Sequence, residues 1–506
     1  MISATSQIKN MKRVFCLLSI LLTLCSSAQD NPANDTISLA RNSAYSKKFG
    51  EADRLLTLYN AHNNDVNALR LHAQVLYWMK DFKEAKNIYE RALYSFPENA
   101  NVKLEYGRLL YQLQKFYKAG KLLNDYLATD SSNVEAHQML AYINLWTGHM
   151  TNAKKEAVWI KNHEPENNEA AYILNQVAFY TAPYIKLQGL IYSDDQPIQR
   201  QGFEPEAGVY KSWWLSPYIK TSLNNFDADK QYKTSWTEFG NKISLAPAKL
   251  QIESSIGYFQ GSNFNGDITW KVKLTQKISS SVSLDASTEK APYQYTLASI
   301  KTPFLYQLSE AGLSLDNKNH WLGRIAFHNQ GFDDGNNCYT AYFWLLAPII
   351  HKNDFSIKAG YAFSYANSEW NTFQPKQPIA MPLVLNKEVD GIYEPYFTPN
   401  EQTIHSLLAS VYIPFSKTAG FSSNLNAGIS AHASQPDLVV SRNGVGPLFI
   451  KKTYEDFQYN PIDFSGELHF KLSSNLFFNA NYNYKSLIFF KAHTVNVQLK
   501  YLFTHA

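Results

Sequence analysis

Cysteine is scarce in this chain of 506 residues, which contains only three. Cys16 and Cys25 lie in an apolar stretch near the N-terminus, so Cys338 is the only cysteine in the remainder. One cysteine cannot form an intramolecular disulfide, and this count excludes a Cys-rich metal site or a small disulfide-stapled secreted domain. Cys338 stands among aromatic residues, and we expect it to be a small buried hydrophobic side chain.

An excess of charge of one sign is also missing, because 47 Lys and Arg residues face 43 Asp and Glu residues, for a net charge of +4. The basic residues are scattered, which excludes a nucleic-acid-binding protein that relies on phosphate contacts. A hydrophobic fraction of 45% excludes an intrinsically disordered chain. The length requires at least two domains.

Apolar runs long enough for a membrane helix are absent outside the N-terminal stretch, and that stretch is itself too short to span a bilayer. The apolar segment 14–24 follows basic residues and precedes the small residues 26–28, as in a signal peptide. We predict a signal peptide over residues 1–28, with Met11 as the true start. A lipoprotein anchor at Cys25 is the weaker alternative, because a leucine precedes that cysteine.

Small residues recur with a period of about 34 residues between position 33 and position 178, at spacings where two helices of a hairpin approach closely. Successive copies carry Ala73, Phe82, Ala85, Tyr89, Ala92 and Pro97; Gly107, Phe116, Ala119, Leu123 and Tyr126; and Ala141, Gly148, Met150, Ala153, Ala157 and Pro165. A looser copy with Ala40, Phe49, Ala52 and Leu56 precedes them. The segment resembles the tetratricopeptide repeat family, which implies an α-solenoid that serves as a binding scaffold and ends in a capping helix near residues 169–179.

From Pro183 to the end of the chain, apolar and polar residues alternate with a period of two. In one such segment Ile268, Trp270, Val272 and Leu274 alternate with Thr269, Lys271 and Lys273. The alternation fits a soluble sandwich or a membrane barrel, and the apolar faces rich in Tyr and Trp favour the barrel. We predict a transmembrane antiparallel β-barrel of roughly 14–16 strands over residues 183–506.

Two long stretches, Glu369–Gln402 and Pro436–Pro461, are expected to be extracellular loops or to fold inward and narrow the pore. Short turns at 352–354 and 473–475 are expected on the periplasmic side, together with the repeat domain. The segment Asp333–Asn337 has the residue types of a calcium loop without its spacing, and we expect a solvated turn. No motif predicts a catalytic, cofactor-binding or metal site.

A leader, a tetratricopeptide domain and a C-terminal barrel together resemble the exopolysaccharide-export outer-membrane proteins of the cellulose and poly-N-acetylglucosamine type. Within the barrel, Tyr396, Phe397, Thr398 and Pro399 resemble an aromatic-aromatic-Ser/Thr-Pro element of that family. The resemblance implies a protein without enzymatic activity or cofactor, embedded in outer-membrane lipid. Its periplasmic repeats would contact a periplasmic or inner-membrane protein and guide a polysaccharide into the pore.

Six lysines on the polar side of the strand pattern are candidate lumen residues along the polymer path: Lys271, Lys273, Lys277, Lys358, Lys485 and Lys500. Their excess points to an anionic or a neutral polymer, although any aqueous lumen is polar. Two other functions stay open. Surface-lipoprotein translocators also join a tetratricopeptide domain to a barrel of this size, and the barrel could instead anchor a periplasmic scaffold without passing any cargo.

Overall fold

The computed structural model describes residues 32–504, apart from 246–247, 318, 353, 377–383, 487 and 489. The predicted signal peptide lies outside the described residues. Contacts divide the chain into two compact units, Met1–Met139 and Leu140–Ala506. Among the helices that the structure describes, none combines the length and apolar character needed to cross a membrane.

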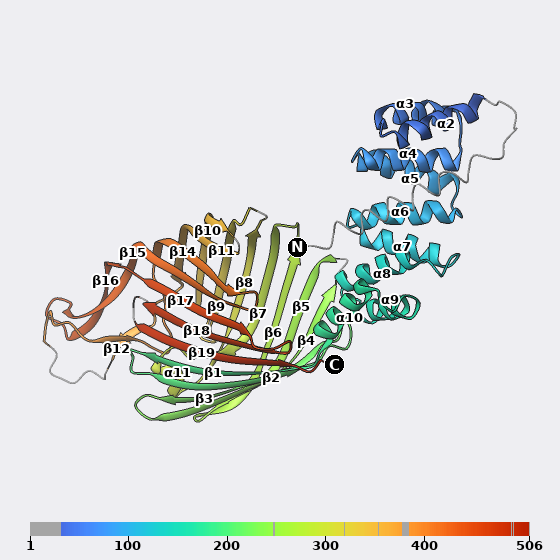
Figure 1. The fold of residues 1–506 in the computed structure, drawn as a ribbon. Helices are drawn as coiled ribbons and strands as arrows, with labels where there is room; N and C mark the ends of the chain where they lie inside the picture. The colour runs from blue at the N-terminus through green and yellow to red at the C-terminus, as the bar shows by residue number, and fades with distance from the viewer. Residues whose placement is uncertain are drawn as a thin grey trace. The chain divides into compact units, whose positions relative to one another are not determined.

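Residues 32–181 form α-helices arranged as successive antiparallel pairs (Figure 1). Their bounds are α2 (Pro32–Tyr45), α3 (Phe49–His62), α4 (Val66–Trp78), α5 (Phe82–Ser95), α6 (Ala100–Gln112), α7 (Phe116–Leu127), α8 (Val134–Trp146), α9 (Met150–His163) and α10 (Asn168–Thr181). Each predicted repeat copy coincides with one pair. Ala73 and Ala85 are fully buried, as expected for positions where helices touch. At Gly107 a Cβ atom would stand 3.1 Å from Leu123, so glycine permits the close approach.

Polar contacts join the first helix of one pair to the first helix of the next. The guanidinium of Arg70 on α4 donates to Glu105 on α6, with Nε 3.1 Å from the carboxylate. Arg108 on α6 donates to Glu135 on α8 through two hydrogen bonds of 2.7 Å, and this pairing raises the pKa of Arg108. Equivalent positions in successive pairs therefore interact, as a repeat architecture requires.

Strands begin directly after Pro183, and each pairs antiparallel with its neighbours. The strands of the ring are β1 (Tyr184–Asp194), β2 (Gln199–Gly208), β3 (Pro217–Asp227), β4 (Gln231–Leu245), β5 (Leu250–Gly261), β6 (Phe264–Lys277), β7 (Val282–Pro292), β8 (Leu305–Asp316), β9 (Leu322–Gly331), β10 (Asn337–Lys352), β11 (Phe355–Ser368), β14 (Gln402–Ser416), β15 (Ala419–Arg442), β17 (Ile462–Lys471), β18 (Leu476–Ser486) and β19 (Lys491–Leu502). Because β19 also pairs with β1, the described strands form a closed barrel of sixteen. The predicted fold class is confirmed, at the upper end of the predicted strand number.

The outer surface of the ring is apolar. On neighbouring strands β1 and β19, Leu187 faces Leu499 and Ile185 faces Tyr501, and about 40% of each of the two leucines is exposed. A soluble sandwich would turn such side chains toward a common core, whereas the closed ring leaves them on its outside. The alternative of a soluble sandwich is therefore excluded.

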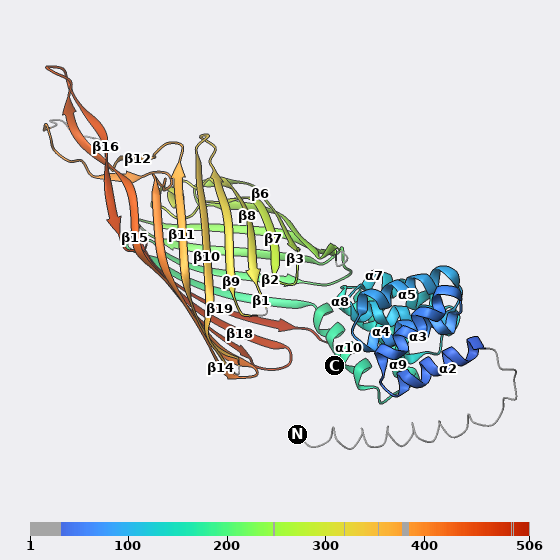
Figure 2. The ribbon, with the colours of Figure 1, turned by 90° about the horizontal axis from the view of Figure 1, so that it is seen from above.

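The prediction of a loop over Pro436–Pro461 is wrong. The distal half of β15 continues past the ring and pairs with β16 (Leu448–Tyr459), while its proximal half pairs with β17. Figure 2 shows this hairpin extending beyond the other strands. Pairing within the hairpin satisfies the backbone hydrogen bonds, so a polar composition does not require a loop. Leu438 and Val440 of the hairpin are almost fully buried.

The two ends of the ring differ in their connections. The connections from β10 to β11 and from β17 to β18 lie at the end where Tyr184 enters the ring, and Asn475 accepts a backbone hydrogen bond from Leu502 there. The opposite end carries the longer connections. One contains the helix α11 (Leu297–Lys301), and the segment 369–401 contains the short strands β12 (Phe373–Pro375) and β13 (Gly391–Tyr393).

Candidate functional site

Side chains that converge from separate strands identify the inner face of the ring. Tyr306 on β8 and Cys338 on β10 pack in one cluster with Tyr396, and Trp236 on β4 packs against the same cluster. Strands that are not neighbours can bring side chains together only on the concave side of a closed sheet. Side chains alternate between the two faces along each strand, and the cross-strand register carries the assignment to the neighbouring strands. The inner face of each remaining strand follows from these two rules.

This register places all six candidate lysines on the inner face. Lys271, Lys273 and Lys277 alternate along β6 on the same side as Thr269, whose hydroxyl accepts a hydrogen bond from Trp236 Nε1 at 2.8 Å. Lys485 lies opposite Asp463, and the remaining lysines occupy equivalent inward positions: Lys358 on β11 and Lys500 on β19. Their part in a polymer path remains a proposal.

Strands β1–β9 line the lumen with cations and carboxylates that pair with each other. Arg324 Nη2 lies 2.6 Å from Asp285 on β7 and also contacts Glu310 on β8. Further pairs in this sector are Lys186 with Glu206, Lys220 with Glu204 at 3.5 Å, and Lys271 with Glu289 at 3.8 Å. The inner wall of β1–β9, which we call the ion-pair sector, therefore carries both signs of charge in close alternation.

Strands β15, β17, β18 and β19 line the lumen mainly with amides and hydroxyls. Their inward residues form cross-strand rows: Asn424, Ser465, Asn483 and Thr494; Asn481 and Asn496; Asn479 and Gln498. Asn424 Nδ2 donates to Ser465 Oγ at 3.3 Å. We call this wall the amide sector. The few charged side chains of this sector include both signs. Glu467 lies between Ser422 and Asn481 in the register, and Lys500 lies near the end of β19.

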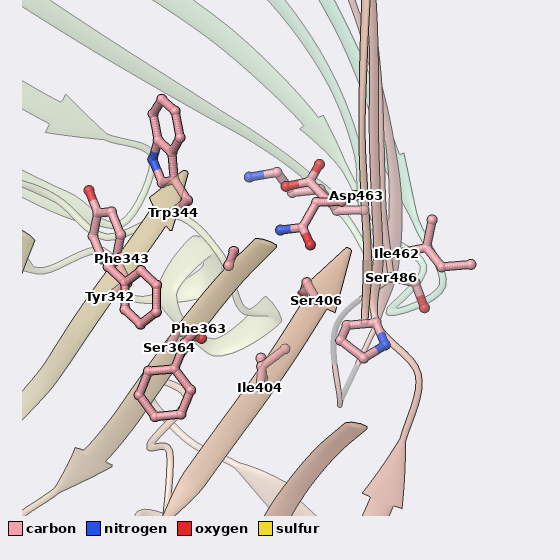
Figure 3. A pocket seen from close by; sticks show the side chains of 14 residues that line it. Tyr342, Phe343, Trp344, Phe363, Ser364, Ile404, Ser406, Ile462, Asp463 and Ser486 are labelled. Carbon is pink, nitrogen blue, oxygen red and sulfur yellow. The ribbon is translucent and has the colours of Figure 1, made fainter. Parts of the chain in front are cut away.

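A recess of about 320 Å³ lies where the amide sector meets β10, β11 and β14. Figure 3 shows Tyr342 and Trp344 of β10 on one side and Asp463 of β17 on the other. Small inward residues line the recess between these sides: Ala362, Ser364 and Ser406. Tyr342 also accepts a hydrogen bond from Arg324 Nε at 3.1 Å, which ties the recess to the ion-pair sector. Sequence reasoning identified Lys485 but missed the aromatic pair.

The motif Tyr396–Pro399 packs against the mouth of the ring. Tyr396 is 2% exposed, stacks on Phe332 with ring centroids 3.5 Å apart, and donates a hydrogen bond of 2.6 Å to Asp334. Burial raises the pKa of Tyr396, so its phenol stays protonated and able to donate. Thr398 is fully buried and accepts from the Thr372 amide at 3.1 Å. The sequence predicts that Glu369–Gln402 is an extracellular loop or folds inward to narrow the pore. The part of this stretch around Tyr396 folds inward.

The turn Asp333–Asn337 is exposed at Asp333, Asp334 and Gly335, as its composition predicts, but it also makes buried contacts that the prediction does not include. Asn336 is fully buried and donates to the Trp370 carbonyl at 2.9 Å, while Asp334 accepts from Tyr396 and from the Asn336 amide. The partners come from a segment more than 30 residues away, which a local pattern does not reveal. Among the residues described, no group of three or more His, Cys, Asp or Glu side chains could hold a metal ion.

A comparison with protein-family models matches residues 76–143 to the tetratricopeptide repeat. The matched residues form helix pairs, as that repeat does. They span α5 to α7 with the end of α4 and most of α8, which are the helices whose alanines and glycine mediate close packing. The predicted recognition of a repeat array followed by a barrel is confirmed.

Solved structures similar to the chain include a bacterial polysaccharide outer-membrane secretin, with 9% identity, a TM-score of 0.45, and coverage of 64% of this chain and 99% of that one. YrrB, a tetratricopeptide protein with an unusual peptide-binding site, matches 29% of this chain and 75% of its own at 18% identity and a TM-score of 0.28. MamA from Desulfovibrio magneticus matches 30% of this chain and 87% of its own at 16% identity and a TM-score of 0.29. No curated protein matches the chain.

Proposed function

We propose that the protein exports a polysaccharide across the bacterial outer membrane. The observation that carries this proposal is the closed ring of sixteen strands with an apolar outer face and a polar inner face. A closed ring satisfies every backbone hydrogen bond without water, so it suits a hydrocarbon environment, and the polar lining suits a water-filled duct. The tetratricopeptide array would then lie in the periplasm after removal of residues 1–28.

The division of labour follows from the two kinds of architecture. The array offers a repeated surface for a periplasmic or inner-membrane protein and for cargo that approaches the pore. The duct contributes many weak polar contacts and no bond-forming chemistry. A chain of sugars slides best where no single contact is deep enough to trap it, and the amide sector provides contacts of that kind.

The decisive experiment compares cells that lack the protein with complemented cells. We expect the mutant cells to retain polysaccharide in the periplasm, as measured by a glycan assay on periplasmic extracts, while surface lipoproteins remain displayed. Loss of lipoprotein display with unchanged polysaccharide secretion would overturn the proposal and favour a lipoprotein translocator. Normal export of both cargoes would favour a barrel-anchored scaffold.

A further inference from the structure

The two sectors of the lumen wall bear on the charge of the cargo, a question that rests on the proposed export function. In the ion-pair sector the cations do not present an uncompensated positive surface. Lys186 contacts Glu206, Lys220 contacts Glu204, and Arg324 contacts both Asp285 and Glu310. A polyanion would meet these carboxylates at every step, and a polycation would meet the lysines and the arginine. An uncharged chain would disturb neither set.

The amide sector has the chemistry that hydroxyl groups of sugars recognise. A side-chain amide offers two donors and an acceptor, and a hydroxyl group offers one donor and accepts as well, so each matches the other without a charge. Same-face residues on one strand lie about 7 Å apart and neighbouring strands about 5 Å apart, which makes the rows a dense lattice. A moving chain exchanges one such hydrogen bond for the next with little net change in energy.

The recess continues this lattice toward the mouth of the ring. Asn426 and Lys485, which line it, follow Asn424 and Asn483 by two residues on their strands, and Asp463 lies between them in the register. The opposite signs of Asp463 and Lys485 leave this row without net charge. Trp344 and Tyr342 add aromatic faces at the far side, as Figure 3 shows. The volume of about 320 Å³ lies at the lower end of ligand-binding pockets, which is suited to a small unit such as a sugar ring.

We infer that the amide sector is the track of an uncharged polysaccharide and that the Trp344 recess binds one of its sugar units. Polymers of neutral hexoses or of N-acetylated hexosamines fit this description, whereas uronic-acid polymers and free amino-sugar polymers do not. Of the candidate lysines, Lys271 then acts through its carboxylate partner Glu289, and Lys485 lies opposite Asp463 in the register.

The test measures binding of labelled oligosaccharides of equal length to the full-length protein in detergent. The probes are a neutral glucose oligomer, a neutral N-acetylglucosamine oligomer, a hexuronate oligomer and a free glucosamine oligomer. We expect at least one neutral probe to bind about tenfold or more tightly than either charged probe. Equal or tighter binding of a charged probe, or no binding of any probe, would overturn the inference.

Two sets of variants locate the binding. The combination Asn479→Ala, Asn481→Ala and Asn483→Ala removes three amides of the track, and we expect affinity for the neutral probe to fall about tenfold or more. Its matched control is Ser283→Ala with Ser287→Ala on the inner face of β7, which should leave affinity within about twofold. Trp344→Ala should lower affinity about tenfold, whereas Leu345→Ala on the outer face of the same strand should not.

Each variant is checked for a folded barrel by its heat-dependent mobility in gels, so a failure to fold is distinguished from a loss of binding. Neutral-probe binding that is unaffected by both the track and the recess variants would overturn the inference. That result would not affect the export proposal. The export proposal is tested separately, by the polysaccharide that cells lacking the protein retain in the periplasm. Loss of lipoprotein display in those cells would overturn the export proposal independently of the oligosaccharide data.

Discussion

Adjacent residues of one strand in this barrel experience opposite environments. Val497 on β19 points outward and is 41% exposed, whereas Gln498 points inward beside Asn479 and Gln188. Arginine at Val497 is expected to reduce the free energy of unfolding by about 2–4 kcal/mol, because it places a charge in the apolar band of the membrane. Arginine at Gln498 should be far better tolerated. Urea titrations of the protein refolded into lipid vesicles measure both changes.

Equal destabilisation by the two arginines would mean that the faces are assigned wrongly. Inward position alone does not guarantee tolerance, as Thr269 shows. Its side chain points inward but is 1% exposed and accepts the hydrogen bond from Trp236. Arginine at Thr269 is therefore expected to destabilise the barrel, because packing of the inner wall near the mouth leaves no room for a larger side chain.

At the scale of an element, the aromatic ring of Tyr396 anchors the end of the connection between β11 and β14. Tyr396→Ala would remove a ring buried among Tyr293, Phe304 and Phe332, and truncation of a buried aromatic residue costs about 3–5 kcal/mol. We expect this variant to release the connection, which would increase protease cleavage within it and raise ion conductance in planar bilayers.

Tyr396→Phe is the matched control, because it keeps the stacked ring and loses only the hydrogen bond to Asp334. Its cost should be about 1–3 kcal/mol, since the hydrogen bond involves a carboxylate. Cleavage and conductance should then lie near those of the unmodified protein. Unchanged cleavage in the alanine variant would show that the other anchors, such as the hydrogen bond from Ser368 to the Pro399 carbonyl, hold the connection without the ring.

At the scale of the whole molecule, the barrel is expected to assemble without the repeats. Deletion of residues 33–178 leaves every strand of the ring with both of its neighbours, from β1 to β19. We expect the truncated protein to migrate as a folded barrel in unheated gel samples and to reach the outer membrane, while secretion of polysaccharide falls. A truncated protein that fails to fold, or one that secretes normally, would contradict this division.

The candidate site could be predicted only in outline. The period-two alternation placed Lys271 and Lys485 on the polar face of their strands, because side-chain direction depends on position along one strand. The pairing of Lys271 with Glu289 and the position of Trp344 across from Asp463 depend on which strands are neighbours and in what register. Tyr396 was singled out by resemblance, but nothing local in the sequence shows that it is buried against Phe332.

The sequence by itself determined the local architecture of the protein: helices where alanines recur with the repeat period, strands from Pro183 onward, and the face of each strand. These features depend on contacts between residues close together in the chain, so a linear pattern records them. Only the tertiary structure decided that β15 leaves the ring to pair with β16, that Tyr396 packs inward, and that the lumen divides into an ion-pair sector and an amide sector. Ring closure brings together residues more than 300 positions apart, such as Leu187 and Leu499, and such contacts depend on the register of the whole barrel.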